Sequence, residues 1–430
     1  MGKRSQILVV FTVTLLALSV VFSCQIVYAA SSVDDWPLFR HDASHTGFSS
    51  GVAPTSNVVQ LWNYTINEAG ITVVAPPVVA NGFVYVGSAD NNLYCLDAAT
   101  GTKVWSFAAG GETDSSPAVV DDRVYVGSSN GYVYCLDAAA GTQVWNQSVM
   151  GSADSPVNFV DGRVYVESQL GDVYCLDAAS GQEIWNFPTK GTAHDLSPAV
   201  SDGYVYAGSN NGDVLCIDAA SGLEAWHFIA DGAVSSPVAV DGFVYFGCRD
   251  GNAYCLDASD GTKSWNFTAW YNSDGPSHGY HWGNTMSSPA VANGRVYVGS
   301  GDFDVFCLDA SSGDKIWNVS TSAEVYAPPT VAGDYVLVGS YDGNVYCFDT
   351  SSGAEVWRAA AGVFSPVNAA GSAGSPVVAD GVVYVVGNGV LSAWGSQSSA
   401  STFPWFEVML MAVLVIIAAA IVAYLYYRLR

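Results

Sequence analysis

The sequence predicts an all-β, eight-bladed β-propeller, and three observations carry this prediction. A run of the form Tyr-Cys-Leu-Asp, then a glycine, then a tryptophan returns seven times, with 40, 40, 41, 39, 52 and 40 residues between successive cysteines. Each repeat holds four short apolar runs separated by turn signals, as expected for antiparallel strands. An incomplete eighth repeat, residues 374–394, lacks a last strand that residues 58–66 can supply. Four strands in about 40 residues are typical of a propeller blade.

The second repeat shows the order of the expected strands. A short apolar run, "SSPAVV", is turned by "DD" into "RVYVGS", which "NG" turns into "YVYCLD", and "AAAG" leads to the closing run "TQVWN". In the first repeat, we expect Asp97 to accept bonds from backbone N–H groups of the last turn. Gly101 supplies the positive φ angle that re-enters a strand, and Trp105 folds its ring over a neighbouring blade. The tryptophans expected to dock blade on blade are Trp62, Trp105, Trp145, Trp185, Trp226, Trp265, Trp317 and Trp357.

The repeated cysteine lies in the middle of a strand, between aromatic and aliphatic neighbours. We expect it to be a small buried hydrophobic residue, because equivalent positions of adjacent blades are too far apart for a disulfide. Cys248 stands outside this pattern on the strand that pairs with that of Cys255, and a bridge there is an open alternative.

The two ends of the chain have the composition of membrane segments. Residues 1–30 resemble a signal peptide, with a basic start, an apolar stretch and small residues near Ala29. After the N-terminal segment 31–56 and the propeller 57–395, residues 396–404 form a polar linker, and 405–427 are apolar and long enough to span a bilayer. The basic tail 428–430 indicates a cytoplasmic C-terminus. We therefore expect a single-pass protein of the cell membrane with an extracellular propeller.

The formal net charge of −25 excludes one class of partner. A surface this acidic repels phosphate backbones, so nucleic acid is not an expected ligand. The acidity is explained either by solubility in a cation-rich exterior or by binding of divalent cations. The carboxylates expected at one mouth of the channel either form turns or hold such a cation: Asp90, Asp114, Asp154, Asp172, Asp195, Asp231, Asp250, Asp302, Asp304, Glu324 and Asp342.

The repeated Asp-x-x-x-Gly-x-x-x-Trp element and the run "DWPLFRHDASHTG", from Asp35 to Gly47, make residues 34–395 resemble the pyrroloquinoline-quinone-like (PQQ-like) propeller repeat family. The family includes quinone-dependent alcohol and sugar dehydrogenases, non-enzymatic scaffolds such as the propeller lipoprotein of the outer-membrane assembly machine, and surface proteins. Its dehydrogenases hold quinone and calcium over the channel and carry a catalytic Asp and often a vicinal cysteine pair. Here no position matches that Asp, and no two cysteines are adjacent. The resemblance implies a secreted or membrane-anchored protein of the non-enzymatic type.

The longest break in the repeats, residues 266–286, predicts a loop over one mouth of the channel. It gathers aromatic rings and histidines that either bind a sugar, a planar ring or a metal, or cap the channel by their own packing. His41 and His45, in the N-terminal segment, are expected to be structural. The candidate ligand-binding residues of the loop are Trp270, Tyr271, Asp274, His278, Tyr280, His281 and Trp282. Four Asn-x-Ser/Thr sequons directly after tryptophans are expected at the exposed rim and are glycosylation candidates: Asn63, Asn146, Asn266 and Asn318.

No catalytic residue and no metal ligand emerges from the sequence. A nucleophile with its base, a phosphate-binding loop and a Cys-x-x-Cys motif are all missing from it. We therefore expect a binding or scaffold module for an envelope protein, a glycan or another ligand. The alternatives are a dehydrogenase-like enzyme, with PQQ or calcium as cofactor, and a purely structural component of the envelope. The oligomeric state stays open.

Overall fold

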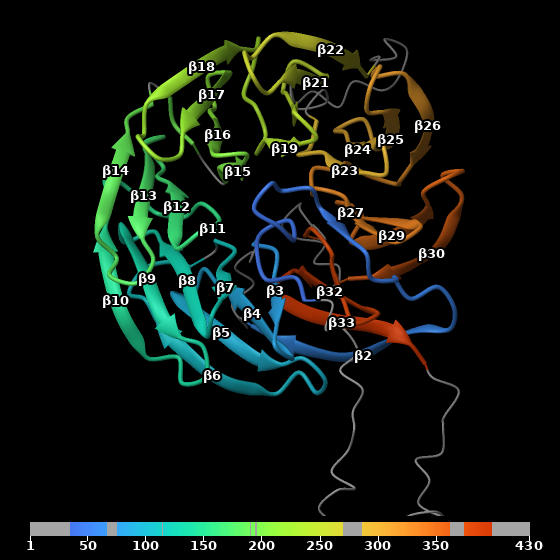
Figure 1. Cartoon of the computed structure of the whole chain (residues 1–430). Helices are drawn as coiled ribbons and strands as arrows, with labels where there is room; N and C mark the ends of the chain where they lie inside the picture. The colour runs from blue at the N-terminus through green and yellow to red at the C-terminus, as the bar shows by residue number, and fades with distance from the viewer. Residues whose placement is uncertain are drawn as a thin grey trace, which may run out of the picture.

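In the computed structural model, eight sheets stand as blades around a central axis (Figure 1). The structure describes residues 35–66, 75–113, 115–189, 191–193, 196–269, 286–361 and 374–397. Every regular element in these ranges is a strand, and no helix there is long and apolar enough to cross a membrane. The prediction of an all-β, eight-bladed propeller is confirmed. The expected signal peptide, the expected membrane helix and the tail lie outside the described residues.

Each blade has four antiparallel strands, ordered from the axis to the rim. Blades 1 and 2 comprise β3 (Val78–Ala80), β4 (Phe83–Gly87), β5 (Asn92–Asp97), β6 (Lys103–Ala108), β7 (Ala118–Val120), β8 (Arg123–Ser128), β9 (Tyr132–Asp137) and β10 (Gln143–Ser148). Blades 3 and 4 comprise β11 (Asn158–Val160), β12 (Arg163–Glu167), β13 (Val173–Asp177), β14 (Glu183–Phe187), β15 (Ala199–Ser201), β16 (Tyr204–Gly208), β17 (Asp213–Asp218) and β18 (Glu224–Ile229). Blades 5 and 6 comprise β19 (Val238–Val240), β20 (Phe243–Gly247), β21 (Asn252–Asp257), β22 (Lys263–Thr268), β23 (Ala290–Ala292), β24 (Arg295–Gly299), β25 (Asp304–Asp309) and β26 (Lys315–Ser320).

The last two blades each include a strand from the N-terminal part of the chain. Blade 7 comprises β27 (Thr330–Ala332), β28 (Tyr335–Gly339), β29 (Asn344–Asp349) and β30 (Glu355–Ala360), with the short β1 (Phe48–Ser49) parallel to β27 at the axis. Blade 8 comprises β31 (Val377–Ala379), β32 (Val382–Gly387), β33 (Val390–Ser396) and, at the rim, β2 (Val58–Thr65). The strand β2 pairs with β33 from Val58↔Ser396 to Thr65↔Val390. The predicted closure of the ring by residues 58–66 is therefore confirmed.

The inner strands of a blade are buried on both faces. In β9, the four residues from Val133 to Leu136 are all buried. Adjacent residues of a strand point to opposite faces of the sheet, and neighbouring blades cover both faces of these inner strands; one apolar cluster joins Leu93 of blade 1 to Val124 of blade 2. In the outermost strands, such as β10, exposed residues alternate with buried or half-buried ones from the tryptophan onwards.

A β-bulge in each outermost strand aims its tryptophan at the next blade. In blade 1, Lys103 pairs with Leu96 and Trp105 pairs with Cys95, so Val104 is the extra residue. The bulge exposes Val104 and turns the indole inward. The same offset precedes Trp62, which lies opposite Ala393 instead of a cysteine.

Each of the eight indoles donates its N–H to a carbonyl oxygen of the next blade or of the chain beside it. The Trp105 Nε1 lies 2.9 Å from the Ala138 oxygen. In blade 8, where the two ends of the chain meet, no turn connects the third strand, β33, to the fourth, β2. Trp357 of blade 7 therefore donates to the Pro54 oxygen instead, at 2.6 Å. The other pairs are Trp62–Ala98, Trp145–Ala178, Trp185–Ala219, Trp226–Ala258, Trp265–Ala310 and Trp317–Thr350.

The eight described cysteines are buried free thiols. In each of blades 1 to 7, the repeated cysteine lies opposite the tryptophan, as Cys95 lies opposite Trp105. Burial raises the pKa of the Cys95 thiol to about 12. The thiolate, which is the reactive form, is therefore suppressed at every ordinary pH.

Candidate functional site

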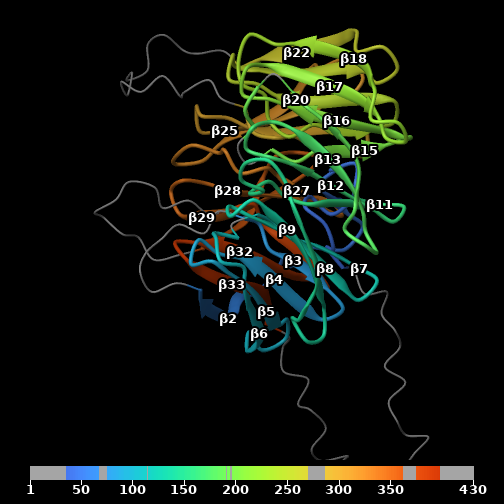
Figure 2. The same ribbon diagram turned by 90° about the vertical axis from the view of Figure 1, so that its left-hand side faces the viewer.

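The strand connections define two faces of the ring. Because the strands of a blade alternate in direction, the turns between first and second and between third and fourth strands lie on one face, here called the closed face. The turns between second and third strands, and the connections from blade to blade, lie on the opposite face, here called the open face. Seen from the side, the blades run across the disc between these two faces (Figure 2).

The axial segment, residues 35–54, fills the centre of the ring, where the blue ribbon runs in Figure 1. It starts at the closed face, where the Asp35 carboxylate accepts a bond from the backbone N–H of Asn81, in the β3–β4 turn, at 3.2 Å. It returns to that face at Ser49, whose oxygen accepts from the N–H of Gly333, in the β27–β28 turn. The channel is therefore occupied by the chain itself.

The axial segment contacts the innermost strands of seven successive blades. In six of them, a backbone N–H of the blade donates to an oxygen of the segment, for example Val200 to Ala43 at 2.7 Å. In blade 3, the Asn158 side chain donates to the same Ala43 oxygen at 2.8 Å. These bonds satisfy the inner strand edges that face the axis. The six backbone pairs are Val79–Trp36, Val119–Pro37, Val200–Ala43, Ala239–Ser44, Val291–Thr46 and Val331–Gly47.

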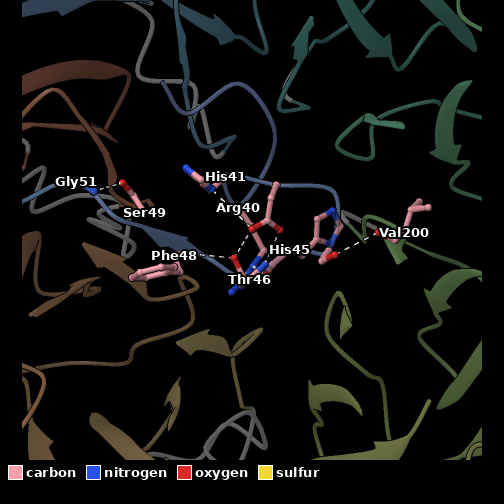
Figure 3. Close-up of polar contacts among 10 residues, drawn as sticks. Arg40, His41, His45, Thr46, Phe48, Ser49, Gly51 and Val200 are labelled. Atoms are coloured by element: carbon pink, nitrogen blue, oxygen red, sulfur yellow. Dashed lines mark hydrogen bonds and ion pairs between the residues drawn. The ribbon is translucent and has the colours of Figure 1, made fainter. Parts of the chain in front are cut away.

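His45 is fully buried on the axis, among blades 3, 4 and 5 (Figure 3). Its Nδ1 donates to the Pro237 carbonyl oxygen at 3.2 Å, since a carbonyl can only accept. Its unprotonated Nε2 lies 3.3 Å from the Asn158 amide nitrogen and 3.3 Å from the Ser197 hydroxyl oxygen. Burial, with the nearby Arg40 charge, lowers the pKa of His45 to about 3. The imidazole is therefore a neutral structural group, in agreement with the expectation for His45.

Arg40 is a buried cation on the same axis. Its side chain is held from two sides: Nε donates to the His45 oxygen at 2.9 Å, and Nη2 donates to the Pro289 oxygen. Its Nη1 is buried and has no hydrogen-bond partner among the described residues. Burial lowers the pKa of Arg40 to about 9, which leaves it protonated at neutral pH. Sequence reasoning did not single out Arg40, although a lone arginine within the apolar run "WPLFR" was the available signal.

The loop that carries these two side chains is conformationally strained. Arg40, His41 and His45 adopt φ angles of 57°, 80° and 61°, a region that costs non-glycine residues about 1 kcal/mol or more each. Asp42 holds the loop by accepting a bond from the Thr46 N–H at 3.0 Å. The ring of blades around the segment therefore imposes a conformation that a free peptide would avoid.

The described part of the open face is acidic and carries exposed apolar side chains. Its aspartates act in the turns, as one of the two sequence interpretations expected: Asp90 accepts from the Tyr94 hydroxyl at 2.6 Å, and Asp250 from the Tyr254 hydroxyl at 2.5 Å. Among the described residues, no group of three acidic, His or Cys side chains can hold a metal ion. The exposed apolar side chains include Met150 (66 % exposed), Leu170 (49 %) and Phe303 (37 %).

The ligand-binding candidates of the long loop, from Trp270 to Trp282, lie outside the described residues, as do Asp114 and Asp195. The structure therefore leaves that predicted site untested. The four sequon asparagines, at positions 63, 146, 266 and 318, are all exposed on the outermost strands β2, β10, β22 and β26. Their glycosylation stays a prediction.

Blade 3 carries a buried acid that sequence reasoning missed. Glu167 ends β12 where six other blades have glycine, for example Gly87 and Gly127. A Cβ at those glycines would lie 1.5 Å from the Thr113 oxygen or 1.8 Å from the Ala153 oxygen. Neither carboxylate oxygen of Glu167 has a partner among the described residues, and burial raises its pKa well above 4.5.

The residues on the described axis do not fit a quinone cofactor. Arg40 and His45 fill the channel centre, and the cavity that remains beside Arg40 measures about 10 Å³. That is room for about one water molecule and not for a fused-ring quinone. A calcium ion is also not matched there, since the described residues offer no cluster of three candidate ligands.

Comparisons with known proteins agree with this architecture. The chain is similar to the crystal structure of BamB from Moraxella catarrhalis, with 19 % identity, a TM-score of 0.61 and coverage of 80 % of this chain and 99 % of that one. It is also similar to a quinohemoprotein alcohol dehydrogenase from Pseudomonas putida HK5, with 15 % identity, a TM-score of 0.67 and coverage of 86 % and 81 %. Likenesses this distant show the fold alone. A comparison with curated proteins finds no match.

The sequence itself matches one family along nearly the whole propeller. Residues 59–267 and 268–399 match the model PQQ_2, described as outer membrane protein assembly factor BamB. The match agrees with the repeat, the docking tryptophans and the eight blades, and the chain belongs to this PQQ-like, BamB-type propeller family.

Proposed function

We propose that this protein is a membrane-anchored binding and scaffold module that presents its open face to an envelope protein. One observation carries the proposal: both ends of the described propeller lie on the closed face. Asp35 lies beside the β3–β4 turn, and the N–H of Gln397 donates to the Asn57 oxygen at the start of β2. An anchor that follows residue 397 therefore directs the closed face towards the membrane. The open face then points away from it.

The properties of the open face support a protein as the partner. Exposed Met150, Leu170 and Phe303 are of the residue types that protein interfaces bury. The surrounding acidic turns favour a partner with a basic rim. A rigid ring suits this role, because the axial segment and the docked indoles hold the loops of the open face in place before binding.

Catalysis by a quinone is the weaker alternative. The similar quinohemoprotein alcohol dehydrogenase shares the fold, but here the chain's own Arg40 and His45 occupy the axis. Addition of PQQ and calcium to the purified full-length protein should therefore give no alcohol-dependent dye reduction. Reduction above that of a heat-denatured control would support the enzyme instead.

Site-specific photocrosslinking in the native cells tests the scaffold proposal. The photoreactive residue p-benzoylphenylalanine is placed at Leu170 on the open face or, as a matched control, at Ala140 on the closed face; both positions are exposed. We expect light to produce one discrete, protease-sensitive conjugate from position 170 and none from position 140. A conjugate from position 140 alone, or none from either, contradicts the proposal. A conjugate removed by glycosidase identifies a glycan as the partner.

A further inference from the structure

A groove lies on the closed face of the ring between blades 2 and 3. Its volume is about 530 Å³, which is in the range of sites that bind small molecules. The residues that line it come from β8, β9, β10 and β11 and from the closed-face turns of the two blades. None of these lining residues belongs to the axial segment or to the turns of the open face.

The corresponding places between blades 3 and 4 and between blades 6 and 7 are each bridged by an arginine of the chain. Arg163, the first residue of β12, donates from Nη1 to the Ala219 oxygen of blade 4. Arg295, the first residue of β24, donates from Nη1 to the Thr350 oxygen of blade 7. The repeats therefore show that this place between two blades accommodates a guanidinium group.

Arg123 has the same place in blade 2 but does not bridge to blade 3. It donates to the Asp122 oxygen at 3.1 Å and pairs with Asp137 at 3.3 Å, and both residues belong to its own blade. Phe159 stands where the other seven blades have a buried valine or alanine, and it is only half-buried. Its ring stacks on Tyr125, with 5.6 Å between the ring centroids. The groove therefore has a partly exposed aromatic ring in its lining.

Carboxylates give the lining of this groove an excess of negative charge. Asp121 and Asp161 are exposed, and Asp177 is half-buried. None of the three forms an ion pair with a described residue. Arg123 is the one cation of the lining, and Asp137 offsets its charge. A cation suits such a lining, because a carboxylate forms strong charge-assisted hydrogen bonds with it and the face of an aromatic ring attracts it.

We propose that this groove binds the guanidinium group of a small organic cation. The planar guanidinium lies against the Phe159 ring and donates to the Asp161 carboxylate, whose two oxygens match the fork of its N–H groups. The remaining carboxylates of the lining attract a second positive charge, such as an amine at the other end of the molecule. The site does not depend on the proposed function, because it lies on the closed face, whereas the proposed protein partner contacts the open face.

Ligand-observed NMR on the purified full-length protein tests the site. Agmatine carries a guanidinium and an amine; N-carbamoylputrescine has nearly the same size and the same amine, but a neutral urea replaces the guanidinium. We expect saturation transfer from the protein to agmatine that titrates with a single Kd, and binding of N-carbamoylputrescine that is weaker by about tenfold. Equal binding of the two compounds, or no binding of agmatine at millimolar concentration, would overturn the proposal. Binding of a neutral hexose instead of agmatine would also overturn it.

Matched variants assign the binding to this groove. Asp161→Asn should weaken agmatine binding about tenfold, whereas Asp202→Asn, the same change in the equivalent turn of blade 4, should leave it unchanged. Both aspartates are exposed and have φ angles of 49° and 51°, which asparagine tolerates equally. Phe159→Val, which introduces the residue of six other blades, should weaken binding about threefold. Equal losses in the two asparagine variants would show that only the general acidity of the surface acts, and an unchanged affinity in Asp161→Asn would refute the site directly.

Discussion

The contact between an indole and a glycine of the next blade can be tested with two substitutions of the same kind. Gly141 has a φ of +66°, and a Cβ added there would lie 2.5 Å from Cδ2 of Trp105. Gly162 has a similar φ of +74°, but a Cβ there would meet nothing within 4 Å. Gly141→Ala therefore combines backbone strain with a collision, and Gly162→Ala has the strain alone.

The structure sets the size of the expected difference. Both variants place alanine in the left-handed region, which costs about 1–2 kcal/mol. In Gly141→Ala the Trp105 ring must also move, which endangers its 2.9 Å bond to the Ala138 oxygen. The loss of that bond costs about 0.5–1.5 kcal/mol, and overpacking costs about 1–3 kcal/mol. Gly141→Ala should therefore be less stable than Gly162→Ala by about 1.5–4.5 kcal/mol.

Equilibrium unfolding in urea, followed by circular dichroism, measures this difference on the full-length protein. Tryptophan fluorescence, which sums over the 13 tryptophans of the chain, should differ from that of the parent in the folded Gly141→Ala variant if the Trp105 ring has moved. The Gly162→Ala variant should keep the parent fluorescence spectrum. If the two variants lose the same amount of stability, the indole contact contributes nothing measurable, and the account of how adjacent blades are held together is wrong.

Three other predictions concern single features of the fold. Asp122 has a φ of 60° in a turn where six other blades have glycine, so Asp122→Gly should raise the free energy of unfolding in urea by about 0.5–1 kcal/mol. The raised pKa of Glu167 means that the folded protein keeps a proton that the unfolded chain loses above about pH 4.5. The stability of the parent protein that depends on this proton is therefore present below that pH and is lost as the pH rises. Because glutamine does not titrate, Glu167→Gln should unfold at a higher temperature than the parent at pH 7 but not at pH 4. The buried cysteines of the native protein should not react with a thiol reagent at pH 8, and they should react fully in guanidinium chloride. Fast labelling of the native protein would contradict their burial.

The blades could be predicted because the information for each lies within about 40 residues. Gly101, with a φ of 70°, and the Asp97 carboxylate, which accepts from the Thr100 N–H at 2.8 Å, act in one turn. Such turns recur with the same spacing, so the number of strands, their order and the closing role of Trp62 follow from counting repeats. The burial of inner strands on both faces did not follow, because alternation in one strand does not reveal what covers its second face.

The candidate site was less accessible to sequence reasoning. The long loop from Trp270 to Trp282 drew attention because aromatic residues and histidines cluster along the chain, but the structure does not describe it. No local sequence pattern marks Arg40 or Glu167 as unusual. What makes them unusual is that their side chains are buried against residues more than 100 positions away or in the next blade. The Arg40–Pro289 bond, for example, joins positions 249 residues apart.

By itself, the sequence determined the repeating unit, the number of blades and the tryptophans between them, because local turn chemistry and the spacing of apolar residues act within each repeat. The tertiary structure decided that residues 35–54 fill the channel, that both ends of the propeller share one face, and that Arg40 lies buried on the axis with no ion-pair partner among the described residues. These features arise when a ring closes around a segment. Closure brings hydrogen-bond donors of seven blades to that segment, and no pattern within one repeat encodes these contacts.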